Sequence, residues 1–154
     1  MKTIILYATK YGAAKEIAER LSGKMGKAEV RDIKQAGGIE DFDCVIIGTS
    51  VYAGRIRPEA KAFVLKNAAI LKAKKLGIFL SGIGASGEKD YLKNNFAPDI
   101  LQSAKAAKFL GGIFDPKKAG AIERLIIRII TKKSSMINAI DDEKINAFVT
   151  AMNL

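Results

Sequence analysis

Three short stretches of the chain combine glycine with hydroxyl-bearing or small residues, and each directly follows a run of apolar residues. The first stretch comprises Thr9, Lys10, Tyr11, Gly12, Ala13 and Ala14. It leads into a helical pattern of apolar residues at positions 17, 18 and 21. A buried strand, a tight turn and a helix form an anion site, because the free N–H groups of the first helical turn and the positive end of the helix dipole face the ligand. The stretch therefore predicts a phosphate-binding turn.

The second and third stretches are predicted to hold a flat ring. They comprise Ser50, Val51, Tyr52, Ala53 and Gly54, and Ser81, Gly82, Ile83 and Gly84. Their backbone and the face of Tyr52 could enclose an aromatic ligand, although an exposed loop tyrosine explains Tyr52 equally well. Residues 9–14 could likewise form only a strand–helix turn with an N-cap. Matching stretches after two other strands favour phosphate binding over that simpler interpretation.

Histidine is absent from the sequence, and cysteine occurs once, as Cys44. This composition excludes Ser-His-Asp and Cys-His catalysis, and it predicts no metal site because the commonest zinc ligands are missing. Cys44 lies among valine and isoleucine, so it is predicted to be a core residue rather than a redox thiol. No side chain of the three stretches is assigned a catalytic acid–base role.

The formal net charge of the chain is +10, from 26 Lys and Arg residues against 16 Asp and Glu residues. Such an excess indicates an acidic partner, which can be nucleic acid, an anionic membrane surface or a substrate with several carboxylates. The basic residues are spread over the expected helices and no nucleic-acid motif is visible. We therefore expect no nucleic-acid binding.

The length of 154 residues and the hydrophobic content of 49% are enough for one core, so residues 1–154 are expected to form a single domain. No apolar run is long enough to span a bilayer, and the first residues do not have the pattern of a secretory signal. A single cysteine agrees with a reducing compartment. These features predict a cytoplasmic protein.

Strand and helix patterns alternate along the chain. The expected strands are residues 2–8, 27–33, 43–50, 76–81 and 108–114, and the expected helices are residues 13–25, 58–71, 90–106 and 122–133, with a last helix opened by Asp141, Asp142 and Glu143. This alternation predicts an α/β fold, a doubly wound parallel sheet with helices on both faces. Right-handed crossovers favour five strands in the order 2-1-3-4-5. The pair Gly111-Gly112 is predicted to mark a bulge in the fifth strand.

Ligands of such sheets lie beyond the carboxyl ends of the strands, where the three stretches are expected. The dinucleotide motif G-x-G-x-x-G and the P-loop motif G-x-x-x-x-G-K-[ST] are both absent. A phospho-acceptor domain of this topology would need an aspartate at the end of the third strand, where the chain has Gly48, Thr49 and Ser50. The sequence therefore excludes these three kinds of site.

At these positions the chain resembles the flavodoxin family, and the order of elements agrees over essentially the whole chain. The phosphate loop of the family reads T-x-T-G-x-T, and the first stretch keeps Thr9 and Gly12, whereas Tyr11 and Ala14 replace the other two threonines. The second and third stretches look like the two isoalloxazine loops of the family. The resemblance implies that the cofactor is FMN. The two lost hydroxyls are expected to weaken its binding by about a hundredfold.

Within that family the chain is most similar to bacterial menaquinone-dependent protoporphyrinogen IX dehydrogenases. The likeness rests on the Thr-x-x-Gly form of the first loop, on residues 48–54 and on the basic segment 122–133. It implies an FMN enzyme that takes hydrogen from a porphyrinogen and passes it to a quinone. The alternative is an electron carrier that exchanges electrons with a redox protein. Carriers of this family are strongly acidic, so the charge of +10 favours the enzyme.

The segment 122–133 has an apolar side and a basic row of Arg124, Arg128 and Lys132. Its simplest interpretation is an amphipathic helix that packs on the sheet with a solvated basic row. The alternatives are a helix at an anionic membrane surface, which would place the protein at the inner face of the cell membrane, and a row that binds porphyrin carboxylates. A segment of this length is too short to span a bilayer.

Overall fold

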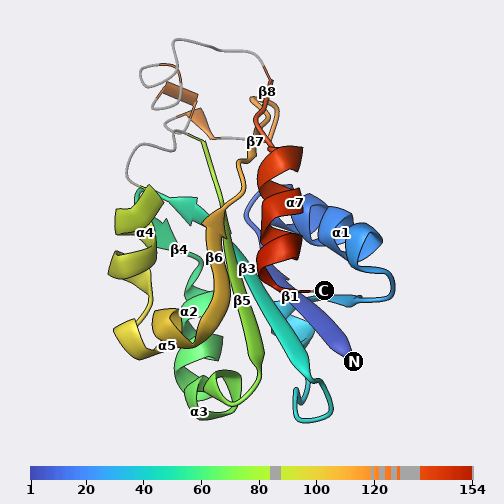
Figure 1. Cartoon of the computed structure of the whole chain (residues 1–154). Helices are drawn as coiled ribbons and strands as arrows, with labels where there is room; N and C mark the ends of the chain where they lie inside the picture. The colour runs from blue at the N-terminus through green and yellow to red at the C-terminus, as the bar shows by residue number, and fades with distance from the viewer. Residues whose placement is uncertain (84–87, 119, 122–123, 126–127, 129–135, 154) are drawn as a thin grey trace.

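A parallel sheet forms the centre of the molecule (Figure 1). The computed structural model describes residues 1–83, 88–118, 120–121, 124–125, 128 and 136–153. The parallel strands are β1 (Thr3–Ala8), β2 (Glu29–Asp32), β3 (Cys44–Tyr52), β5 (Lys75–Ser81) and β6 (Ala104–Phe109). Their order, β2-β1-β3-β5-β6, confirms the predicted order 2-1-3-4-5, because the short strand β4 (Arg55–Ile56) only pairs antiparallel with β3.

Helices cover both faces of this sheet, as predicted. On one face lie α1 (Ala13–Met25) and α7 (Asp142–Ala151), and on the other lie α2 (Pro58–Lys66), α3 (Ala68–Lys72), α4 (Glu88–Asn95) and α5 (Pro98–Ser103) (Figure 1). A short 3-10 helix, η1 (Ile33–Gln35), follows β2. The central strands are therefore buried on both sides, which explains why their sequences are continuous apolar runs.

The strand β3 shows how the sequence divides the core between the two faces. Val45 and Ile47 belong to the cluster under α2 to α5, and Cys44 and Ile46 belong to the cluster under α1 and α7, because successive side chains of a strand point to opposite faces. Burial raises the pKa of the Cys44 thiol and so favours its unreactive protonated form. Cys44 is a core residue, as predicted.

The fifth parallel strand lies earlier in the chain than predicted. It is β6, and the end of the range predicted for it forms β7 (Ile113–Phe114), which pairs antiparallel with β8 (Ile137–Asn138). The predicted helix over 90–106 included the first half of β6, residues 104–106, where alanine and lysine favour a helix, whereas Lys108 and Phe109 belong to the predicted strand. Pairing with the edge of β5 overrides that local preference.

Two predicted helices are each divided in the structure. The range 90–106 contains α4 and α5, because Pro98 cannot continue a helix and instead begins a new one. The range 58–71 contains α2 and α3, which are separated by Asn67. The Asn67 side chain donates a 2.9 Å hydrogen bond to the backbone oxygen of Phe63, as expected of a residue that competes with helical bonding.

Of the predicted helix over 122–133, residues 124, 125 and 128 are helical and the others lie outside the described residues.

The glycine pair at 111–112 does not form a bulge in the fifth strand, so that prediction is wrong. It lies after β6, where the backbone passes very close to two other segments. A Cβ on Gly112 would lie 2.6 Å from the backbone oxygen of Gly82, and a Cβ on Gly111 would overlap the backbone of Ala139. Both positions therefore need glycine for close backbone packing.

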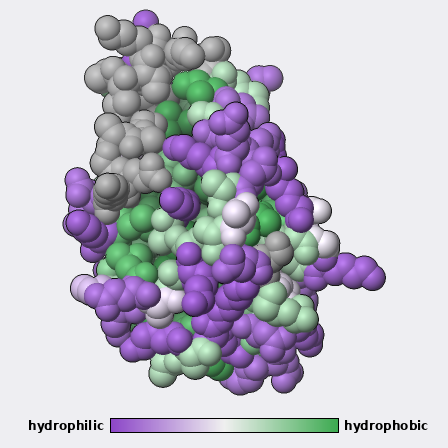
Figure 2. Space-filling model, viewed as in Figure 1, coloured by the Kyte–Doolittle hydropathy of each residue, from purple (hydrophilic) through white to green (hydrophobic). Residues whose placement is uncertain are grey.

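The side of the molecule seen in Figure 2, with α7 and α4 at either side of β6, carries many hydrophilic side chains and smaller apolar areas between them. Large apolar side chains are instead concentrated in the two clusters that flank the sheet. Among the residues that the structure describes, no helix has the length and apolar character needed to cross a membrane.

Gly48 offers a test of the packing between β3 and β5. A Cβ at Gly48 would overlap the ring of Phe79, which in turn packs edge-on against Phe148 of α7 at 6.4 Å. We expect Gly48→Ala to lower the free energy of unfolding by about 1–3 kcal/mol, because the core must move to accept the methyl group. Urea denaturation followed by circular dichroism measures this change.

The matched control is Gly23→Ala in α1, where a Cβ would meet open space. It should raise the free energy of unfolding by about 0.5–1 kcal/mol, because alanine is the better helix former. Equal stability of Gly48→Ala and the unmodified protein would contradict the packing described here.

Candidate functional site

The three stretches singled out in the sequence meet at the carboxyl edge of the sheet (Figure 1). The first follows β1, the second ends β3 and the third ends β5, and these strands are neighbours. Their register pairs Ala8 with Thr49 and Ser50 with Ser81. The structure thus brings residues 9–14, 50–54 and 81–83 together, whereas Gly84 lies outside the described residues.

The turn after β1 leads directly into α1. Thr9 Oγ1 accepts a 2.8 Å hydrogen bond from the backbone N–H of Gly12, and Gly12 has a φ of +100°, which favours glycine. The helix begins at Ala13, and no side chain caps its N-terminus. The first-turn N–H groups therefore have no intrahelical partner and can bind an external acceptor. The Thr9 hydroxyl keeps its own proton to donate to the same acceptor.

Ala13 and Ala14 contribute to this turn through their backbone alone. Both side chains are buried, and the Ala14 methyl group packs in the apolar cluster under α1. A buried methyl group cannot replace a hydroxyl that binds phosphate, so any site here depends on backbone N–H groups, Thr9 and Lys10.

Lys10 connects the first stretch with the second. Its Nζ lies 4.0 Å from the centroid of the Tyr52 ring and 5.4 Å from that of the Tyr11 ring, both within cation–π range. Tyr52 is 40% exposed, so its ring is a partly open platform beside a positive charge.

The second stretch is the tip of a β-hairpin that the sequence analysis did not predict. Tyr52 pairs with Arg55, and the two residues between them, Ala53 and Gly54, have φ angles of 51° and 77°. Two positive φ angles in a two-residue turn match the twist of an antiparallel pair. The backbone of residues 52–55 therefore has a defined shape rather than that of an open loop.

Asn95 of α4 holds this hairpin in place. Its Oδ1 accepts a 3.1 Å hydrogen bond from the backbone N–H of Ile56, and its Nδ2 donates to the backbone oxygens of Gly54 at 2.9 Å and Tyr91 at 2.7 Å. The sequence analysis missed this residue, because nothing in the spacing links Asn95 to a turn about 40 positions earlier in the chain.

The hydroxyl groups of Ser50 and Ser81 are buried and have no hydrogen-bond partner among the described residues. They lie next to each other in the register of β3 and β5. A buried hydroxyl without a partner costs free energy, so this pair is suited to a ligand that bonds to it. Thr49, in contrast, is satisfied within the protein: its Oγ1 accepts from the backbone N–H of Arg57 and donates to the backbone oxygen of Ser50, both at 3.1 Å.

The third stretch is anchored by its backbone. The N–H of Gly82 donates a 3.0 Å hydrogen bond to the backbone oxygen of Gly111, and a Cβ on Gly82 would lie 3.3 Å from the backbone oxygen of Val51. The second and third stretches therefore touch through their main chains. Ile83, at the end of the described part of this stretch, is half-buried.

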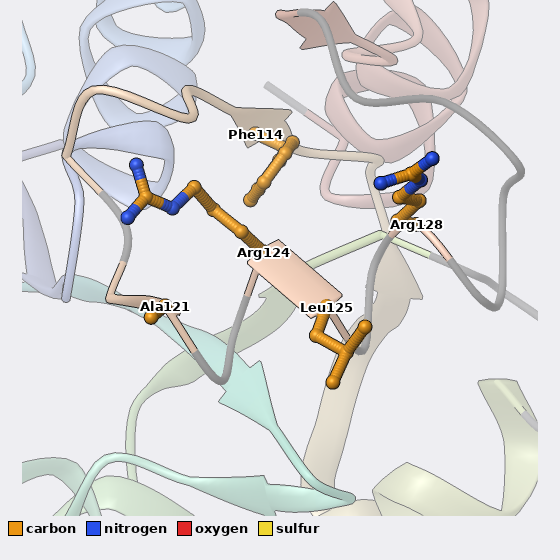
Figure 3. A pocket seen from close by; sticks show the side chains of 5 residues that line it. All are labelled: Phe114, Ala121, Arg124, Leu125 and Arg128. Carbon is orange, nitrogen blue, oxygen red and sulfur yellow. The ribbon is translucent and has the colours of Figure 1, made fainter.

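A separate hollow has a volume of about 300 Å³ (Figure 3). One of its residues lies in β7, which is at the same end of the molecule as the three stretches (Figure 1). The hollow is lined by Phe114, Ala121, Arg124, Leu125 and Arg128. Two of these residues belong to the basic row predicted in the segment 122–133, whereas Lys132 lies outside the described residues.

Comparison with known proteins identifies the fold independently. A family model described as a flavodoxin domain matches residues 4–137. No curated protein matches the sequence significantly.

Several solved structures are similar to the chain. A protein from Bacteroides eggerthii described as a flavoprotein has a TM-score of 0.57 at 14% identity, and the similarity covers 100% of this chain and 99% of that one. Flavodoxin 2 from Bacillus cereus has a TM-score of 0.56 at 20% identity, covering 73% and 85%. A flavodoxin, WrbA-like protein from Agrobacterium tumefaciens has a TM-score of 0.51 at 21% identity, covering 66% and 70%. At such identities the structures agree in fold alone.

Asn95 gives a testable account of how the hairpin is held. We expect Asn95→Ala to lower the free energy of unfolding by about 1–3 kcal/mol, because Gly54 and Ile56 lose a hydrogen-bond partner in a partly buried site. Hydrogen exchange should then speed up at residues 52–56. The neighbouring exposed Asn94→Ala is the control and should change neither quantity. Unchanged exchange at the hairpin in Asn95→Ala would show that other contacts hold it.

Proposed function

This chain belongs to the flavodoxin domain family, and on that premise we propose that it is an FMN-dependent oxidoreductase. Its proposed substrate is protoporphyrinogen IX or a similar anionic molecule, and its proposed electron acceptor is a quinone. FMN, the cofactor of this domain, supplies the redox chemistry when it is bound, and the protein supplies binding, orientation and electrostatics.

The observation that carries the proposal is the set of polar groups gathered at the carboxyl edge of the sheet. The uncapped N-terminus of α1 offers backbone N–H groups, and Thr9 and Lys10 stand beside it. These groups are suited to a phosphate, because an anion is stabilised by N–H donors, a hydroxyl and an ammonium group. They are the residues that would hold the FMN phosphate.

The remaining groups of the edge are suited to the rest of the cofactor. The buried hydroxyls of Ser50 and Ser81 can exchange hydrogen bonds with a polar chain, and Tyr52 offers a ring face for stacking. The main chain of residues 51–54 and of residues 82–83 would flank the flavin ring. Because Tyr11 and Ala14 stand where the family has threonines, we propose weaker FMN binding than a full T-x-T-G-x-T loop would give.

The charge of the protein supports an anionic substrate. A net charge of +10 attracts a molecule with several carboxylates and raises its rate of encounter. The same charge would favour contact with an anionic membrane, where a quinone acceptor is dissolved. We therefore propose that the protein works at the inner face of the cell membrane.

A second candidate function is electron transfer by bound FMN without a substrate of the protein's own. The three stretches at the edge contain no carboxylate and no imidazole, and electron transfer needs no proton donor at the site. The positive charge of the chain argues against this function where the redox partner is also basic, because like charges slow the encounter.

The test of the proposed function uses the protein loaded with FMN under anaerobic conditions. Protoporphyrinogen IX should bleach the flavin absorption, and a menaquinone analogue should restore it. Bleaching by a flavodoxin reductase but not by the porphyrinogen would support the electron carrier. A colourless protein whose melting temperature does not respond to added FMN would contradict both functions.

The phosphate turn can be tested separately from turnover. We expect Thr9→Ala to weaken FMN binding by about tenfold, because a hydroxyl bond to a charged phosphate is lost and the Gly12 N–H loses its partner. Riboflavin, which has no phosphate, should bind Thr9→Ala nearly as well as it binds the unmodified protein. Flavin fluorescence titration measures both affinities.

The control for that titration is Thr150→Ala near the end of α7, whose hydroxyl bonds only to the backbone oxygen of Asn146 among the described residues. It should leave both affinities unchanged. If Thr9→Ala weakened FMN and riboflavin equally, the turn would not be the phosphate site.

A further inference from the structure

We propose that the hollow lined by Arg124 and Arg128 binds the carboxylate edge of a flat, apolar anion. This inference rests on the proposed function and assigns a place to the substrate of that oxidoreductase. It concerns a part of the molecule separate from the three stretches assigned to the cofactor.

The two arginines differ from the paired arginines of the chain. Within the residues that the structure describes, neither guanidinium forms an ion pair, whereas Arg20, Arg31 and Arg57 each pair with a nearby carboxylate. Arg124 and Arg128 are both exposed, and both line the hollow. A guanidinium binds a carboxylate through two parallel hydrogen bonds and stays charged at any physiological pH.

The rest of the hollow is apolar. In Figure 3 the ring of Phe114 lies between the two arginines, and Leu125 and Ala121 lie at the other side of the hollow. Leu125 is 57% exposed, which leaves an apolar side chain open to a ligand. Two cations beside an aromatic ring and a leucine are suited to an anion with an apolar body, because a small inorganic anion would leave the apolar wall exposed to water.

The size of the hollow limits what it can hold. A volume of about 300 Å³ is at the lower end of the range for sites of small molecules. It is large enough for one ring with its acidic substituents. A tetrapyrrole would therefore place only its carboxylate edge there, and its remaining rings would extend beyond the hollow.

The main chain connects this hollow to the predicted flavin-binding loops. Phe114 lies in β7, two residues after the glycine pair 111–112. Gly111 accepts the hydrogen bond from Gly82, and Gly112 packs directly on the Gly82 backbone. The wall of the hollow is thus built on the end of the third stretch, and an extended molecule held at the arginines could reach toward the edge of the sheet.

The experiment compares two ligands that share one ring system and differ in whether their two carboxyl groups are free and charged or esterified. Protoporphyrin IX and its dimethyl ester are titrated against the FMN-loaded protein. The readout is the change in porphyrin emission or the quenching of the tyrosine fluorescence of the protein, which contains no tryptophan. We expect the free acid to bind about tenfold more tightly than the ester, because only the acid offers carboxylates to the two guanidinium groups. Added salt should reduce this difference.

The variant is the double substitution Arg124→Gln and Arg128→Gln, and it should lose the preference for the acid while keeping its affinity for FMN. The matched control, Lys66→Gln with Lys105→Gln, removes the same charge from exposed positions in α2 and β6. It should keep the preference. An unchanged FMN affinity and melting temperature establish that both double variants are folded.

Equal affinity for acid and ester, or a preference that survives the double substitution, would overturn the inference. So would loss of sedimentation with phosphatidylglycerol vesicles in the double variant without any loss of porphyrin binding, because the arginines would then serve a membrane contact. These outcomes are separate from a failure of the proposed function, which would appear as the absence of flavin bleaching by protoporphyrinogen IX in the unmodified protein.

Discussion

The register between β1, β3 and β5 is the constraint on which the candidate site depends. Ala8 lies opposite Thr49, and Ser50 lies opposite Ser81, so three neighbouring strands end at the same level. The residues after each strand must therefore leave the sheet at one edge. A shift of one residue in β3 would exchange Ser50 with Thr49 and turn the buried apolar residues of the strand toward the wrong cluster. Core packing and site geometry are thus fixed by the same hydrogen bonds.

Some polar groups at this edge form hydrogen bonds within the protein, and others have no hydrogen-bond partner among the described residues. Thr49 and Asn95 are fully occupied in holding the turn into α2 and the hairpin after β3. The Ser50 and Ser81 hydroxyls and the uncapped N-terminus of α1 have no such use within the described residues. Buried polar groups without partners lower stability, so their concentration at one point indicates a ligand rather than a structural role.

The sequence predicted the fold well because its apolar runs are strong and its glycines end them. The bounds of α1 and the strand order followed from such patterns. It placed the fifth strand too late in the chain, because the alanine-rich first half of β6 favours a helix and only pairing with β5 makes it a strand. It also missed Asn95, since a side chain that bonds to a distant backbone leaves no periodic signal. Local pattern finds the strands and turns, whereas contacts between distant segments need the structure.

The position of positive charge is more informative than its amount. Arg20, Arg31 and Arg57 contribute to the net charge, yet each is occupied by a neighbouring carboxylate and adds little to the attraction of a ligand. Lys10 lies over the Tyr52 ring, and Arg124 and Arg128 line the hollow at the same end of the molecule. Within the described residues Arg124 and Arg128 form no ion pair, so their charge can act on a partner outside the chain. The carboxyl end of the sheet is accordingly where an anionic molecule would be held, and it is also where the strand register places the predicted cofactor loops.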